Sequence, residues 1–422
     1  MVNKGIGNSL LANYRVLDLT EGGCMLGGRL LGDLGADVIQ VEPPGGSRSR
    51  IGPFYKNVPE PEKSLFWFAY NANKRGITLD IKSQQGQELF KNLAKTADIV
   101  LESFEPGFMG NLNLGYQDLR RVNPDIVYTS ITPFGQTGPK ASYKASDLTI
   151  WASGGYLYAC GSPERAPVGI SFPQATLFGG AEAAIGSLTA IFFRWETGKG
   201  QYVDVSMQEA AISPNMNILQ MWDVNKVEFR RTGGCMYVPA TGVSLPIYFR
   251  CRDGYVMVLL QGGTEPFTSS SGRLVKWMGD EGVAPDWLKK LNWTVDYDAA
   301  TIKQETADKV GQIVERFTLT KTKAEMYQEG AIRRQILIAP VSNTEDIAED
   351  IQLQARNYWK KISHSELADT LAYCGAFIRI DEAPIEYRRR APLIGEHNSE
   401  IFSEEMGILQ KQLDSFKKYG VI

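Results

Sequence analysis

Short apolar runs alternate with helical segments between residues 14 and 132, a pattern typical of parallel βαβ units with right-handed crossovers. The segment 83–97 places Leu89, Phe90 and Leu93 on one helical face and Ser83 at the N-cap. The apolar runs that read as strands are RVLDL (15–19), ADVIQVE (36–42), DIVLES (98–103) and DIVYTSIT (125–132). This alternation predicts a large α/β domain with an open, doubly wound sheet.

The pattern changes along the rest of the chain. A Gly/Pro-rich approach leads into an Ala-rich helix over 181–196, which small residues allow to pack closely, and then into the alternating strand 201–207. Two alternating runs flank Asp253-Gly254, a strong hairpin signal. Helical segments follow over 303–330, and a Pro-containing loop over 338–343. We therefore expect a large domain in 1–225, a smaller α+β domain in 226–340, and a mixed C-terminal region in 341–422.

Composition narrows the function. With 45 Lys+Arg against 48 Asp+Glu, the net charge of -3 argues against a general nucleic-acid or anionic-membrane surface. The five cysteines show no CxxC spacing, which favours the reduced cytosol over a disulfide framework or a zinc cluster. His364 and His397 are the only histidines, so a metal site or a triad built on histidine is not expected. The first twenty residues lack the uninterrupted apolar core of a secretory signal, and no stretch suggests a membrane-spanning helix.

The loops after the predicted strands are the place to look for chemistry, because ligands of doubly wound sheets bind at the carboxyl ends of the strands. These loops read EGGCMLGG (21–28), EPPGGSRSR (42–50), SFEPG (103–107) and TPFGQTGP (132–139). The first lacks the GxGxxG spacing of a dinucleotide site. Just before the strand-like GITLDI, Asn73-Lys74-Arg75 offers two adjacent cations, with Arg suited to bidentate phosphate contact and Lys to a point-charge contact.

Ordered segments between Tyr14 and Ile401 resemble the class III CoA-transferases, the family of formyl-CoA transferase, carnitine CoA-transferase and the 2-methylacyl-CoA racemases. The matching segments include YRVLDLT, GADVIQVEPPGGSRSR, NANKRGITLDI, DIVLESFEPG, SITPFGQTGP, GKGQYVDVSMQEA, APVSN and APLIGEHNSEIF. The resemblance implies a Rossmann-like large domain built from both chain ends, a smaller domain, and two protomers interlocked like linked rings.

The resemblance also implies a CoA site. It places Lys74 and Arg75 near the nucleotide phosphates, and Ser103 and Phe104 beside the adenine or the pantetheine. A CoA thioester and a carboxylic acid would be the substrates, with no metal and no further cofactor. Two contacts differ from the family pattern: Gly22-Gly23 stands where relatives often have Gln, and Pro43 stands where they have Arg or Lys.

The most informative departure concerns the nucleophile. Transferases of this family attack the acyl thioester with one Asp just before the Ala-rich helix, and counting back from Arg194 places Thr176 at that position. No Asp occurs between Asp147 and Asp204, so a shifted alignment gap cannot supply one. In the racemase branch a catalytic His precedes the acid aligned with Asp147, but here the residue is Ser146. The chain is thus expected to have no catalytic residue of its own.

We therefore expect a cytoplasmic chain that pairs with a homologous catalytic subunit in an interlocked heterodimer or heterotetramer. Some members of the family are hetero-oligomers, among them the benzylsuccinate CoA-transferases of anaerobic toluene degradation, which move CoA from succinyl-CoA. Gly262 and Gly263 match in position the glycine loop that closes over the reacting Asp in relatives, although an ordinary strand-to-helix turn would look the same. The alternatives are a self-sufficient homodimer that uses Asp147 or Glu265, and a CoA-binding scaffold without turnover.

Overall fold

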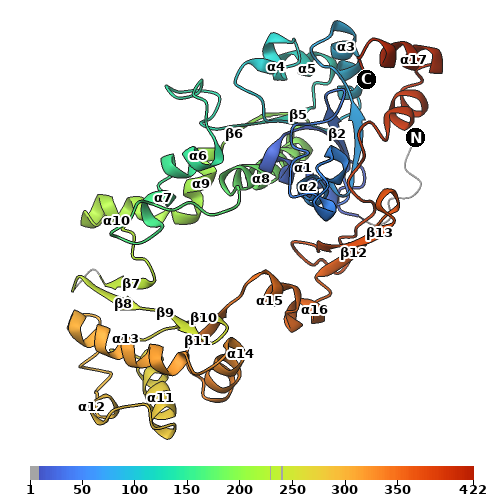
Figure 1. Ribbon diagram of the computed structural model, residues 1–422. Helices are drawn as coiled ribbons and strands as arrows, with labels where there is room; N and C mark the ends of the chain where they lie inside the picture. Colours follow the sequence, from blue (N-terminus) through green and yellow to red (C-terminus); the bar gives the residue numbers. More distant parts are fainter. Residues whose placement is uncertain (1–8, 229, 239–240) are drawn as a thin grey trace. The chain divides into compact units, whose positions relative to one another are not determined.

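The computed structural model describes residues 9–228, 230–238 and 241–422 and divides into two compact units (Figure 1). Unit 1 contains the described residues up to 156, residues 169–227 and residues 352–422. Unit 2 contains residues 157–168 and the described part of 228–351. The first and last described residues therefore belong to the same unit, and most of unit 2 comes from the sequence between them.

A six-stranded parallel sheet forms the centre of unit 1, in the order β3-β2-β1-β4-β5-β6. Its strands are β1 (Arg15–Leu19), β2 (Asp37–Glu42), β3 (Lys74–Thr78), β4 (Ile99–Glu102), β5 (Val127–Thr132) and β6 (Tyr202–Ser206). The predicted α/β fold is confirmed, and the four apolar runs become β1, β2, β4 and β5. Lys74 and Arg75, expected just before a strand, are instead the first two residues of β3.

Helices cover both faces of this sheet (Figure 1). One face packs against α3 (Gln84–Ala94), α5 (Tyr116–Val122) and the C-terminal α17 (Gln410–Lys418). The other face packs against α1 (Met25–Asp33) and α8 (Ala175–Thr197). Helix α3 begins as predicted, because Ser83 accepts a hydrogen bond from the N–H of Gly86 at 3.0 Å. The remaining helices of unit 1 include α2 (Leu65–Asn71), α4 (Phe108–Asn111), α6 (Asp147–Ser153), α9 (Met207–Ile212) and α10 (Asn217–Asn225).

Small residues let α8 lie close to α1, as the sequence suggested. A Cβ added to Gly180 would come within 2.9 Å of the Cys24 carbonyl, and one added to Gly27 would come within 2.8 Å of the Gly180 carbonyl. By length and hydropathy alone α8 could cross a membrane. However, its buried residues pack on the sheet and on α1, which is how a helix of the α/β layer behaves.

Unit 2 contains a three-stranded antiparallel sheet, made of β9 (Tyr248–Cys251), β10 (Gly254–Val258) and β11 (Ile338–Val341), which packs with helices in one core. The Asp253-Gly254 hairpin forms as predicted, with Gly254 opposite Cys251. The loop expected over 338–343 is wrong for its first four residues, because they form β11. Pro340 is tolerated there since β11 is an edge strand. The other elements include β7 (Cys235–Val238), β8 (Val243–Pro246), α7 (Tyr156–Ala159), α11 (Phe267–Asp280), α12 (Asp286–Lys289), α13 (Gln304–Thr318), α14 (Lys323–Glu325) and α15 (Thr344–Ala348).

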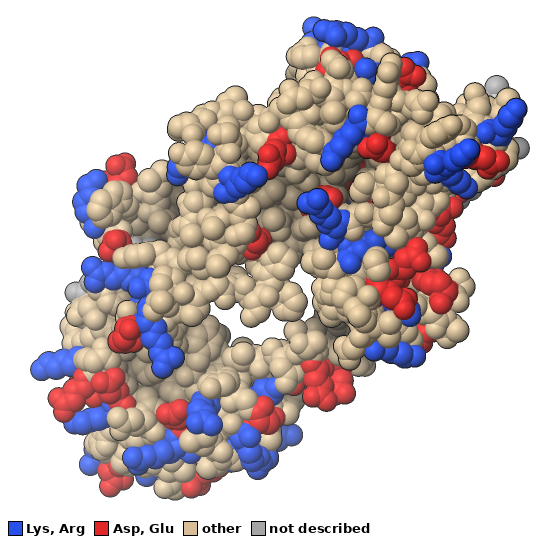
Figure 2. Space-filling model, turned by 45° about the horizontal axis from the view of Figure 1, so that its top comes forward, with Lys and Arg blue, Asp and Glu red and all other residues tan. Residues whose placement is uncertain are grey.

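The C-terminal segment returns to unit 1 through α16 (Ile351–Ala355) and a hairpin of β12 (Trp359–His364) and β13 (Asp369–Cys374). Beyond it, Arg388 closes the end of α1, donating from Nη2 to the carbonyls of Gly32, at 2.6 Å, and Ala36, at 3.0 Å. Acidic and basic side chains are interspersed over the face shown in Figure 2. That distribution fits the near-neutral net charge of -3.

Candidate functional site

The loops after β1, β2 and β4 meet at the carboxyl edge of the sheet, where serine hydroxyls join them. The N–H of Gly22 donates to Ser49 Oγ at 2.8 Å, and the N–H of Glu21 donates to Ser103 Oγ at 2.9 Å. Each hydroxyl fixes a backbone group of a neighbouring loop, so the three loops form one continuous surface. This is the edge at which doubly wound sheets bind ligands.

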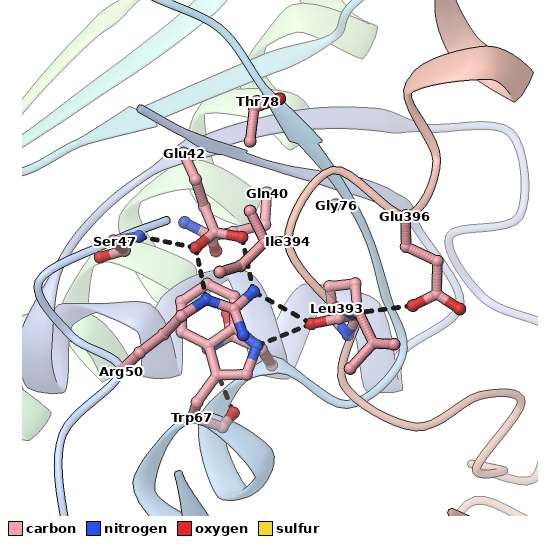
Figure 3. A network of polar contacts seen from close by, with 12 residues as sticks. Gln40, Glu42, Ser47, Arg50, Trp67, Gly76, Thr78, Leu393, Ile394 and Glu396 are labelled. Atoms are coloured by element: carbon pink, nitrogen blue, oxygen red, sulfur yellow. Dashed lines mark hydrogen bonds and ion pairs between the residues drawn. The ribbon is translucent and has the colours of Figure 1, made fainter. Parts of the chain in front are cut away.

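A buried ion pair between Glu42 and Arg50 anchors the loop after β2 (Figure 3). Arg50 donates from Nε and Nη2 to the two carboxylate oxygens, each at 2.7 Å, and its guanidinium lies 3.9 Å from the centre of the Trp67 ring. The Pro392 carbonyl accepts from both Arg50 and Trp67, at 3.1 and 2.9 Å. Arg50 is thus occupied within the fold, whereas Pro43 at the start of the loop is exposed.

Lys74 is buried within unit 1 and does not face a ligand edge. Its ammonium is fully buried and donates to Asp18 at 2.7 Å, Asn71 at 2.9 Å, Gln40 at 3.0 Å and the Met25 carbonyl at 3.0 Å. Burial lowers the pKa of Lys74, although Asp18 offsets part of that effect. With its donors taken by four internal oxygens, this ammonium has none left for a phosphate, which corrects the placement implied by the resemblance.

Arg75 is likewise held by carboxylates. It pairs with Asp37 at 2.6 Å, Glu400 at 2.8 Å and Glu405 at 2.5 Å, and the arginine side chain is 6% exposed. Burial alone would raise the pKa of Asp37, but Arg75 and Arg15 outweigh it and hold that pKa below its ordinary value. Asp37 begins β2, so the cluster lies at the amino edge of the sheet, opposite the candidate site.

Ser103 and Phe104 do lie on the candidate edge. Ser103 holds the loop after β1, as described above, and the Phe104 ring packs against Phe108 with 4.6 Å between the ring centres. The N–H of Phe104 donates to Glu102 Oε2 at 2.7 Å. Their contact with CoA remains a prediction.

Glu102 is a residue of this edge that sequence reasoning missed. It ends β4 and is 4% exposed, and burial raises its pKa to about 7. Its Oε1 accepts a hydrogen bond from the Ser130 hydroxyl, which in turn accepts from Gln136 Nε2 at 2.7 Å. A single Glu in an apolar run gives no sequence signal of this kind, because the pKa is raised by burial, and that burial depends on segments remote in the sequence.

Thr176 is the second residue of α8 and lies against Asp147. Both its N–H, at 2.9 Å, and its hydroxyl, at 3.0 Å, donate to Asp147 Oδ1. The N–H of Gln174 donates to Asp147 Oδ2 at 3.1 Å. Asp147 therefore satisfies free N–H groups at the start of a 23-residue helix, where a negative charge is favourable.

The loop after β1 also closes on Thr176. A Cβ added to Gly23 would come within 2.4 Å of Thr176 Oγ1 and 2.9 Å of the Leu177 nitrogen. A side chain at position 23 would not fit without moving this loop or α8. Gly23 and Thr176 thus form one local arrangement. Ser146, the residue before Asp147, caps α6 through Thr149.

Gly262 and Gly263 lie in unit 2 and pack against the chain around Trp293. A Cβ on Gly262 would come within 2.0 Å of the Trp293 carbonyl, and Gly263 has φ +83°. These glycines therefore have a packing role in unit 2. Glu265 follows them and accepts hydrogen bonds from the hydroxyls of Ser269 and Thr268, which lower its pKa.

Both histidines are engaged within unit 1. The His364 ring lies between Glu366, at 2.7 Å, and the Tyr373 hydroxyl, at 2.8 Å, and His397 Nδ1 accepts from the Gly76 N–H at 3.1 Å. Over residues 9–228, 230–238 and 241–422, no group of three or more His, Cys, Asp or Glu side chains could hold a metal ion.

Comparisons with known proteins support the family resemblance that the ordered sequence segments indicated. The sequence profile described as CoA-transferase family III matches residues 11–398. The chain belongs to this family. It is 35% identical to the succinyl-CoA:(R)-benzylsuccinate CoA-transferase subunit BbsE of Thauera aromatica, over 97% of this chain and 98% of that protein.

More distant relatives extend the likeness to the fold. The formyl-CoA:oxalate CoA-transferase of Streptomyces avermitilis is 29% identical over 98% of this chain and 99% of its own length. A crystal structure of a CAIB/BAIF family protein from Brucella suis has a TM-score of 0.81 and 26% identity, and covers 94% of this chain and 99% of that one. This chain thus has the fold of the CAIB/BAIF family protein over nearly its whole length.

Proposed function

We propose that this chain is the non-catalytic subunit of a class III CoA-transferase and acts with a homologous subunit that carries the nucleophilic Asp. The observation behind this proposal is Thr176, which offers a hydroxyl at the start of α8 where relatives have a carboxylate. Asp147 already holds that hydroxyl at 3.0 Å.

The chemistry of CoA transfer explains why Thr cannot replace Asp. A carboxylate that attacks an acyl thioester forms an anhydride, and it then forms its own CoA thioester, so each half-reaction starts and ends at a high-energy acyl group. A Thr hydroxyl would form an ester, which lies well below a thioester in free energy and would not return the acyl group to CoA. Neither histidine is in the candidate edge to activate the hydroxyl.

Apolar surface on unit 1 supports a requirement for a partner. On α8, Phe192 and Trp195 are 61% and 63% exposed. On α10, Leu219 and Val224 are more than 70% exposed, and the helix has no buried residue among those described. Exposed apolar faces of this kind are typical of protein interfaces. The partner we propose is the catalytic homologue, in an interlocked heterodimer or heterotetramer in the cytoplasm.

The similarity to a benzylsuccinate CoA-transferase subunit suggests the reaction, which is transfer of CoA from succinyl-CoA to benzylsuccinate by the assembled enzyme. The partner's Asp would perform the covalent step. This chain would supply half of the interface, and Ser103 and Phe104 would face the nucleotide or pantetheine if CoA enters its own edge. The loop at Gly262 and Gly263 would face the catalytic site.

Co-expression tests this proposal. The chain is purified alone and together with a family III homologue that carries the nucleophilic Asp, and CoA transfer from succinyl-CoA to benzylsuccinate is measured. We expect activity only in the complex, abolished by replacing the partner's Asp with Ala and retained when Thr176→Ala is made in this chain. Activity of the single chain would support a self-sufficient enzyme using Asp147 or Glu265, and inactivity of a well-formed complex would support a scaffold. Hydroxylamine trapping of an acyl group on any carboxylate of this chain would also reject the proposal.

A further inference from the structure

An apolar hollow of about 540 Å³ lies on unit 1 beside the β12–β13 hairpin. Its walls come from α1, α2 and β13, and include Leu26, Leu30, Phe68, Tyr70, Tyr373 and Tyr387. The volume is within the range of small-molecule pockets, roughly 300 to 1,000 Å³. We call it the aromatic slot.

The charges within the aromatic slot are already balanced. Arg29 pairs with Asp33 at 2.7 Å and donates to the Ala69 carbonyl at 2.8 Å and to the Tyr387 hydroxyl. Its guanidinium also lies 4.6 Å from the centre of the Tyr387 ring. The aromatic slot therefore presents mainly apolar and aromatic side chains to a ligand, and it carries little net charge.

A second hollow, of about 410 Å³, carries the charge. Arg356, Lys360 and Arg379 line it together with Tyr358 and Phe377, and Asp381 is its one acidic lining residue. None of the three cations forms an ion pair with any residue in the described part of the chain, unlike Arg50, Lys74 and Arg75. We call this hollow the basic pocket.

The two hollows adjoin. Phe377 lines both of them. Lys360 of the basic pocket pairs with Tyr373 of the aromatic slot across the hairpin, so the two side chains leave the same face of the ladder. Trp359, the residue after Tyr358 of the basic pocket, pairs with Cys374 of the slot across the same hairpin.

We propose that the aromatic slot and the basic pocket form one binding site for an organic acid that carries an aryl group. The ring enters the slot, where it contacts aromatic side chains, and the carboxylate lies in the basic pocket, where arginine offers paired donors. A ring alone suits only the aromatic slot, and a carboxylate alone suits only the basic pocket. The site therefore selects molecules that carry both groups. Neither Ser103, Phe104 nor Thr176 lines this site, and its failure would leave the proposed function untouched.

Calorimetry on the purified full-length chain tests this site with 3-phenylpropionate as the probe. Propionate lacks the ring, and 3-phenylpropanol lacks the charge. We expect saturable binding of 3-phenylpropionate at least tenfold tighter than that of either comparison compound, which corresponds to about 1.4 kcal/mol. Absence of saturable binding, or equal binding of propionate, would overturn the proposal.

Variants locate the binding. Arg356→Gln with Arg379→Gln should weaken 3-phenylpropionate at least tenfold, and Lys361→Gln, a neighbouring charge outside the pocket, should not. Ala69→Trp should fill the slot and abolish binding, whereas Thr370→Trp adds the same side chain to β13 outside the slot. Unchanged affinity in both site variants would reject this location.

Alkylation of Cys374 gives an independent readout, because this exposed thiol lines the slot. We expect 3-phenylpropionate to slow its reaction with iodoacetamide in the wild type and not in Ala69→Trp, as followed by peptide mass spectrometry. Protection by the homologous subunit but not by the acid would assign the surface to the subunit interface and overturn the proposal.

Discussion

The buried carboxyl of Glu102 makes a prediction about stability and pH. Its pKa is raised from 4.5 to about 7, chiefly by burial. Each pKa unit corresponds to about 1.4 kcal/mol, so ionising Glu102 costs about 3 kcal/mol more in the folded protein than in the unfolded chain. Because the folded state favours the protonated form of Glu102, this form contributes folding stability. That contribution is fully present below the unfolded pKa and is lost as the pH rises through the folded pKa. The window therefore runs from about 4.5 to about 7.

Replacing Glu102 with Gln removes this titration. Gln can still accept from the Phe104 N–H and can donate to Ser130, so changes in hydrogen bonding give an offset that does not depend on pH. We expect the free energy of unfolding of Glu102→Gln, measured relative to wild type, to rise by about 3 kcal/mol between pH 4.5 and pH 8. All other titrating groups cancel in that difference.

Hydrogen exchange of peptides from β4 and β5 in increasing urea is the suitable assay, because it reports unit 1 without assuming that both units unfold together. Glu105→Gln, at an exposed carboxylate three residues further on, is the matched control. A difference between Glu102→Gln and wild type that stays constant across the pH window would refute the reasoning.

Two further predictions concern buried contacts. Lys74→Met leaves Asp18 buried without its cation and should lower the free energy of unfolding of unit 1 by about 3 to 5 kcal/mol in the same exchange assay. Lys82→Met, at an exposed lysine, should change that free energy little, and equal effects of the two variants would contradict the buried pair. In unit 2, Gly262→Ala forces a Cβ against the Trp293 carbonyl and should lower the thermal midpoint of that unit. Gly272→Ala, in open space on α11, should instead raise the stability of unit 2 by up to about 1 kcal/mol. The reverse order of stability would disprove the packing role of Gly262.

The sequence predicted the elements whose signals are local. The apolar runs at β1, β2, β4 and β5 and the capped helix α3 need only neighbouring residues to be recognised. β11 was missed because its apolar residues surround a proline, and its strand character depends on pairing with β10, about eighty residues earlier in the chain.

The candidate site shows the same division. The loops after the predicted strands 15–19, 36–42 and 98–103 meet at the carboxyl edge, as the rule for parallel strands predicted. Ser103 and Phe104 lie at this edge, and their contact with CoA stays a prediction. The positions of Lys74 and Arg75 could not be predicted from composition, because their partners are remote. Asp18 is 56 residues from Lys74, and Glu405 is 330 residues from Arg75. A cation beside a strand looks the same in sequence whether it meets a phosphate or a buried carboxylate.

The hydrogen bonds that Pro392 accepts from Arg50 and Trp67 can form only late in the synthesis of the chain. Pro392 leaves the ribosome 325 residues after Trp67, which at 5 to 20 residues per second is a delay of roughly 15 to 65 s. During that interval the early strands exist without the segment that covers Arg50 and Trp67, while all of unit 2 is made. A nascent chain with this architecture stays incomplete until translation is nearly finished, which gives chaperones, or a subunit translated nearby, time to act on the open form.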